Sequence, residues 1–269
     1  QLAAINLVTP MQNIITNFGS GITVAGAVLI AQYIGAGEKE DARSMANQIF
    51  ICAMGFAVVC AALCFLGTPA IVNWLGADGG TAYYARVYLR VVIWDMPFLY
   101  MVNIFSAVHQ AQGDTVRPML LNLGGITLNL FLDPFFMIIL DMGTAGAALA
   151  TLLAKAVPAT VAFILLCRPE NDICLNRRYM QLQREKLGMI LKVGLPTAIG
   201  GSTMQLGFLL MSKNVFVYGT EAMAAYGIGN KVNGLITLPS NAIGSATATI
   251  VGQNMGAKQP ERAEQGYRF

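Results

Sequence analysis

The sequence has few charged residues, and this excludes an ordinary soluble protein. Asp, Glu, Lys and Arg make up 12% of its 269 residues and apolar residues make up 55%, whereas soluble domains carry about 25% charged residues. The mean hydropathy is +0.58. A net charge of only +3 gives little support for an anionic partner, so we expect no nucleic acid among the partners.

The chain also lacks the residue patterns of catalytic and metal centres. His109 is its only histidine, and neither a GxSxG nor an HExxH sequence occurs. We therefore expect no enzyme, no catalytic residues and no cofactor. The cysteines have no metal-ligand spacing, and we interpret them as packing residues or free thiols. They are Cys52, Cys60, Cys64, Cys167 and Cys174.

Long apolar runs make up most of the chain. A membrane-spanning helix needs roughly 20 predominantly apolar residues, and seven runs reach this length. They cover residues 7–33, 46–74, 87–110, 119–140, 144–167, 189–218 and 223–253. The sequence therefore predicts an all-α, polytopic membrane helical bundle.

Basic residues gather in every second connection between these runs. Six of them lie between residues 168 and 192, whereas the connections that contain Asp141 and Glu221 carry only an acid. Because short cytoplasmic loops are enriched in Lys and Arg, this pattern predicts a cytoplasmic C-terminus. We expect a multi-pass protein of the cell membrane, namely the plasma membrane of a prokaryote.

One apolar run occurs twice in the chain. Residues 3–43 align without a gap with residues 224–264, a displacement of 221 positions that carries Gln32 to Gln253. The two runs cross the membrane in the same direction, which predicts parallel internal repeats, an arrangement of many transporters. Both runs are rich in small residues, which we interpret as close helix packing, with the lining of a cavity as the alternative.

The repeat predicts a larger two-lobe protein of about twelve helices, of which the chain holds seven. We expect residues 1–167 to form the first lobe without its first helix. Residues 168–192 are predicted to be a cytoplasmic linker between the lobes, and residues 193–269 the first two helices of the second lobe.

Asp133 is the strongest candidate for a functional group inside the membrane, because ionisable residues there are costly and commonly serve function. Asn129 precedes it by four residues, so both lie on one helix face. Thr127 and Thr151 offer hydroxyl oxygens. The pattern predicts a site for Na+ or a proton acceptor, and an Asp satisfied only by polar neighbours is the alternative.

A second candidate pair is Asp95 in the third run and Lys155 in the fifth. Lys155 follows Thr151 by one helical turn. We interpret the two either as a buried ion pair, which is destabilising to break, or as groups that couple protonation to function.

These residues lie in motifs that resemble those of the multidrug and toxic compound extrusion transporters. The likeness runs along the whole chain. It includes IAQYIGAG at residues 30–37, QGDT at 112–115, LNLFLDP at 128–134, GAALAT at 146–151 and VGQNMGA at 251–257. The resemblance implies two lobes of six helices, of which the chain would hold the second to eighth.

The resemblance also implies alternating-access export of cationic or amphipathic compounds in exchange for Na+ or H+. Asn129, Asp133 and Thr151 match the N-lobe cation site of prokaryotic members, which adds an Asp from the first helix. One subgroup has a Glu on the seventh helix, whereas residues 202–205 read STMQ, so the chain is closest to the DNA-damage-inducible subgroup. The expected partners are small-molecule substrates and the lipid bilayer. We expect the full-length protein to be a monomer.

Two other classes of protein compete with this interpretation. A lipid-linked oligosaccharide flippase has a similar fold, but its cavity would need several basic residues, and Lys155 is the only clear cation in the middle of a span. A seven-helix receptor or retinal protein would use Lys231 as the retinal lysine and Asp95 as its counter-ion. The internal repeat argues against the second class.

Overall fold

The computed structural model describes residues 2–74, 86, 90, 93–169, 171–176, 179–216, 218 and 220–268. Within these residues all regular structure is helical, and the predicted all-α membrane bundle is confirmed. The elements are α1 (Leu2–Gly35), α2 (Lys39–Trp74), η1 (Ile93–Asp95), α4 (Met96–Ala111), α5 (Val116–Pro134), η2 (Phe135–Ile139), α6 (Gly143–Leu166), α7 (Arg184–Phe216), α8 (Thr220–Gly256) and α9 (Pro260–Arg268).

The helices follow the predicted apolar runs closely. Four segments of the described residues are long and apolar enough to cross a membrane, and they belong to α1, α2, α5 with η2, and α6. α7 and α8 have 33 and 37 residues and are also long enough to span a bilayer. The run predicted at 87–110 is described from residue 93 onward; of its first six residues, only residue 90 belongs to the described part of the chain.

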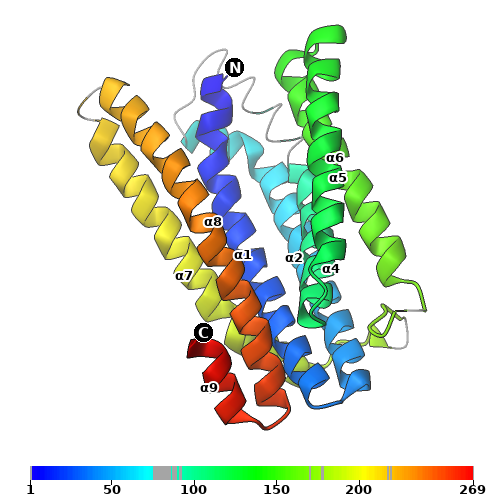
Figure 1. Cartoon of the computed structure of the whole chain (residues 1–269). Coiled ribbons are helices and arrows are strands. Elements are labelled where there is room, and N and C mark those ends of the chain that lie inside the picture. Colours follow the sequence, from blue (N-terminus) through cyan, green and yellow to red (C-terminus); the bar gives the residue numbers. More distant parts are fainter. Residues whose placement is uncertain are drawn as a thin grey trace.

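α1 lies at the centre of the bundle. It packs against α7 and α8 on one side and against α2 and α4 on the other. Figure 1 shows α7 and α8 side by side at one edge of the molecule and α5 and α6 together at the other. The buried core joins α1, α2, α4, α6 and α7, with Ile30, Ile49 and Phe105 among its fully buried side chains.

The two copies of the internal repeat, α1 and α8, cross at their C-terminal ends. A Cβ atom added to Gly35 would lie 1.9 Å from the backbone oxygen of Gln253, and one added to Gly256 would lie 1.9 Å from the backbone oxygen of Gln32. The displacement of 221 positions carries Gly35 to Gly256 and Gln32 to Gln253. The crossing is therefore reciprocal, because each glycine meets, on the other helix, the repeat equivalent of the glutamine three positions before it.

The segment before α7 is fastened to the first turns of α2. Gln48 donates to the backbone oxygen of Gln181 at 2.6 Å and accepts from the backbone N–H of Gln183 at 3.0 Å. Asn47 accepts from the backbone N–H of Asn176 at 3.1 Å. α7 begins at Arg184, inside the segment predicted as a linker over residues 168–192.

Candidate functional site

Asn129 and Asp133 meet on α5. The Asn129 Nδ2 donates to Asp133 Oδ1 at 3.2 Å, and both side chains are half-buried. Their spacing of four residues places them one turn apart on one face of the helix. Pro134 follows directly, and the helix continues as the π-helical turn η2. Such turns are frequent at functional sites, so the carboxylate lies at an irregular point of an otherwise apolar helix.

Thr151 lies on α6, on the wall of the cavity that Asn129 also lines. Its hydroxyl donates to the Ala147 carbonyl oxygen at 2.9 Å, which leaves the oxygen lone pairs free to accept or to bind a cation. Thr127 is exposed, donates to the Leu123 carbonyl oxygen at 2.8 Å and does not line this cavity. The structure thus brings Thr151 and Asn129 together and leaves Thr127 apart.

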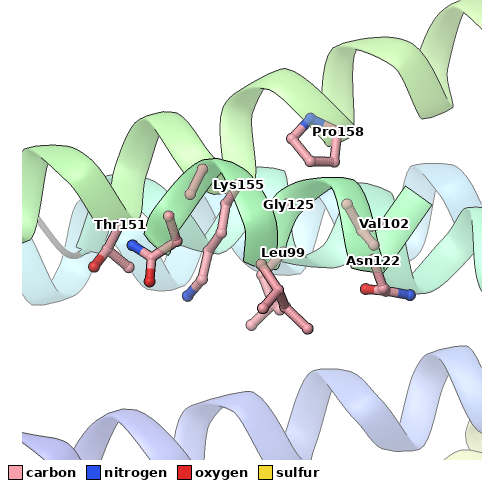
Figure 2. A pocket seen from close by; sticks show the side chains of 10 residues that line it. Leu99, Val102, Asn122, Gly125, Thr151, Lys155 and Pro158 are labelled. Carbon is pink, nitrogen blue, oxygen red and sulfur yellow. The ribbon is translucent and has the colours of Figure 1, made fainter. Parts of the chain in front are cut away.

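The cavity has a volume of about 260 Å³ and lies between α4, α5 and α6. Its wall is mostly apolar, with a few polar side chains, the usual composition of a small-molecule site. Figure 2 shows that Thr151 and Lys155 project from one helix into the same region, with Leu99 from another helix beside them. The lining residues are Leu99, Val102, Asn122, Gly125, Ile126, Asn129, Thr151, Ala154, Lys155 and Pro158.

Asp95 and Lys155 form an ion pair that joins η1 to α6. The Lys155 Nζ lies 2.5 Å from Asp95 Oδ2, and the Asp95 side chain is 1% exposed. Among the described residues, no group donates a hydrogen bond to the other oxygen, Asp95 Oδ1. Lys155 also lines the cavity, so one buried acid is connected through the lysine to the space beside Asn129 and Thr151.

A larger cavity of about 640 Å³ lies between α1, α4 and α8. The described side chains around it carry no charge, and many are small or hydroxylated. They are Ser20, Thr23, Val24, Ala27, Val28, Asn103, Ser106, Ala107, Gln110, Ser240, Asn241, Gly244, Ser245, Ala248 and Thr249. Small residues of both repeated runs therefore line a cavity, as the alternative interpretation predicted. Others pack closely where α1 and α8 cross, as the first interpretation predicted.

Comparison with known proteins agrees with this architecture. The MatE family model matches residues 1–135 and 196–269. The probable multidrug resistance protein NorM of Thermotoga maritima is 32% identical over 247 residues, which are 89% of this chain and 52% of that protein. The probable multidrug resistance protein YoeA of Bacillus subtilis is 24% identical over 274 residues, covering 99% of this chain and 59% of that protein.

A solved structure is similar over nearly the whole chain. It is the outward-facing conformation of a multidrug resistance MATE family transporter of the MOP superfamily, with a TM-score of 0.92 and 27% identity over 99% of this chain and 60% of that chain. The chain thus spans little more than half the length of these relatives. MATE transporters are not enzymes, which confirms that prediction. Since the family model matches most of its residues, the chain belongs to the MatE family of multi-pass membrane transporters.

Proposed function

We propose that the chain is the part of a secondary active multidrug exporter that carries the ion-coupling site. The observation that carries this proposal is the pairing of Asn129 with Asp133 on α5, next to a cavity that Thr151 also lines. A carboxylate inside a membrane helix is costly in free energy, and carboxylates found there commonly serve a function. The names of the relatives as multidrug resistance proteins support export of small molecules.

The coupling ion is Na+ or H+ in this proposal, and the acceptor is the Asp133 carboxylate. Asn129 and Thr151 contribute an amide and a hydroxyl oxygen, which are suitable ligands for a hard cation. Binding of either ion removes the negative charge of Asp133, a large change in a medium of low dielectric constant. The site is therefore able to favour one conformation of the protein when charged and another when neutral.

The cavity between α1, α4 and α8 is the proposed place for the exported compound. It lies between the two copies of the repeat, where transporters of this kind bind their substrates, and it is neutral and about 640 Å³ in volume. Cationic or amphipathic compounds are the proposed substrates. Transport requires that the coupling ion and the compound favour different conformations, since a ligand shifts an equilibrium only through its differential affinity.

The Asp95 and Lys155 pair is a second group whose protonation can be coupled to transport. The lysine lines the smaller cavity and the acid is buried behind it. We further propose that the C-terminus is cytoplasmic, that the protein resides in a prokaryotic plasma membrane, and that the full-length protein is a monomer. Neither cavity has a described cluster of basic residues such as a pyrophosphate-binding flippase would need.

The test is ethidium transport by the full-length protein in vesicles, with Na+ and H+ gradients imposed separately. We expect one gradient to drive transport in the wild type and Asp133→Asn to reduce the driven rate at least tenfold at equal expression. Asp141→Asn is the matched control, because Asp141 is an acid in the turn after η2 and has a φ of 50° that Asn tolerates. Equal transport by the wild type and Asp133→Asn would overturn the coupling role.

A further inference from the structure

We infer that the reciprocal crossing of α1 and α8 is the gate that closes one end of the cavity between α1, α4 and α8, with Gly35 and Gly256 as the residues that allow it to close. This inference rests on the proposed function for its role in transport, but the closure itself is measured without transport. Each step follows from contacts at the C-terminal ends of the two helices.

The crossing lies directly beyond the end of the cavity. On α1 the lining residues end at Val28, and on α8 they end at Thr249. In the next turn the two helices already pack closely, and a Cβ added to Gly252 would lie 3.1 Å from the Ala31 Cβ. One turn further, Gly35 and Gly256 reach the end of their helices. The cavity is therefore bounded on this side by the backbones of α1 and α8 themselves.

The crossing depends on the absence of side chains at both glycines. The atoms that an added Cβ would meet, 1.9 Å away in each case, are backbone oxygens of Gln253 and Gln32. A backbone oxygen cannot rotate away as the end of a flexible side chain can. Even a methyl group at either position must therefore move the two helices apart.

Polar contacts hold the third wall of the cavity against the same end of α8. Gln253 Nε2 donates to the carbonyl oxygen of Ala111, the last residue of α4, at 2.8 Å. Ser245 Oγ donates to Gln110 Oε1 at 3.3 Å. α8 is thus tied to α1 by backbone packing and to α4 by two hydrogen bonds, of which the bond of Gln253 to Ala111 lies at the crossing.

The internal repeat explains why the crossing has two equivalent glycines. Gly35 and Gly256 are equivalent under the repeat, as are Gln32 and Gln253. A substitution at either glycine separates the same crossing. We therefore expect the two single variants to have similar effects, and the double variant to add little to either of them.

The experiment measures access to the cavity through this end. In the full-length protein, freed of other cysteines, Ala248→Cys places a thiol on the cavity wall. Vesicles oriented with the ends of α1 and α8 outward are treated with a membrane-impermeant maleimide. We expect slow labelling in this background and at least tenfold faster labelling when Gly35→Ala or Gly256→Ala is added.

Gly234→Ala is the matched control, because it makes the same change on α8 at a position where an added Cβ meets nothing within 4 Å. Labelling of the folded Gly35→Ala and Gly256→Ala proteins at the control rate would overturn the inference. If neither glycine variant folds, Gln253→Ala decides, because it removes the bond to Ala111 without adding volume. Faster labelling of Gln253→Ala supports the gate, and an unchanged rate refutes it.

This readout is independent of the ethidium assay. A glycine effect on labelling in a protein that does not transport ethidium would leave the gate standing and refute the proposed function. Driven ethidium transport together with labelling at the control rate in all variants would leave the proposed function standing and refute the gate.

Discussion

Asp95 holds a carboxylate at a position that almost no solvent reaches, with one of its oxygens bound to Lys155. Removal of the lysine alone leaves a buried charge without its partner, which costs about 3 kcal/mol or more in comparable sites. We expect Lys155→Met to lower thermal stability by this amount and Lys155→Met with Asp95→Asn to recover most of it. The measurement is thermal unfolding of the detergent-purified full-length protein.

The control for this residue pair is Lys192→Met, which removes an exposed lysine of α7. Such a surface change is expected to stay within about 0.5 kcal/mol of the wild type. A double variant that is no more stable than Lys155→Met would show that the ion pair is not the reason for the loss.

At the same residue scale, the sequence predicted some neighbours of the site and left others open. The spacing of Asn129 and Asp133 was sufficient to predict that their side chains meet, because residues four apart lie about one helical turn apart on the same face. Asp95 and Lys155 are 60 residues apart, and their pairing depends on how η1 and the following α4 pack on α6. Helical periodicity carries no information about that packing, so a buried ion pair was only one of two interpretations.

On the scale of elements, the connection before α7 is held by a side chain that reaches it from α2. Gln48 is fully buried and satisfies the backbone groups of Gln181 and Gln183. Gln48→Leu leaves these groups without a partner, at a cost of about 1–3 kcal/mol each if they stay buried. We expect lower thermal stability and at least fivefold faster trypsin cleavage between α6 and α7.

Gln112→Leu is the control for this element, since its side-chain amide donates to the Val108 carbonyl oxygen of its own helix. It should leave the cleavage rate unchanged. Equal cleavage of Gln48→Leu and the wild type would mean that the connection is held by other contacts, such as the ion pair of Lys186 with Asp41.

The predicted runs located the long helices but missed η2 and α9. Hydrophobicity marks the lipid-exposed length of a helix, and it does not report a local change to π-helical hydrogen bonding beside Pro134. α9 is short and charged, and it begins with Pro260, a residue favoured in the first turn of a helix. It packs against α8, a tertiary contact that apolar runs do not indicate.

Over the whole molecule, the repeat in the sequence predicted two related halves, and the structure shows their equivalent helices crossing at equivalent residues. The volume between them was not predictable. It depends on the angle at which α1 and α8 diverge from their crossing and on where α4 lies against them. The small residues that form both the crossing and the cavity wall look alike in the sequence, because a missing side chain serves close packing and open space equally well.

α1 also packs against α7, and substitutions at this contact distinguish an effect on stability from an effect on the gate. A Cβ added to Gly21 would lie 2.5 Å from the backbone oxygen of Gly194, whereas one added to Gly188, also on α7, would meet nothing within 4 Å. The same substitution therefore has opposite effects at the two positions. Gly21→Ala is overpacked and should lose about 1–3 kcal/mol, whereas Gly188→Ala should gain up to about 1 kcal/mol from the higher helix propensity of Ala.

Thermal unfolding of the two full-length variants under identical detergent conditions measures the difference. Because Gly21 lies more than three helical turns before Gly35, its substitution strains the middle of α1 and not the crossing with α8. We therefore expect Gly21→Ala to lower the unfolding temperature while the Ala248→Cys thiol is labelled at the background rate. Gly35→Ala should instead accelerate labelling. If Gly21→Ala accelerated labelling as much as Gly35→Ala, α1 would move as a rigid unit against both α7 and α8, and gating would belong to the whole interface between the halves.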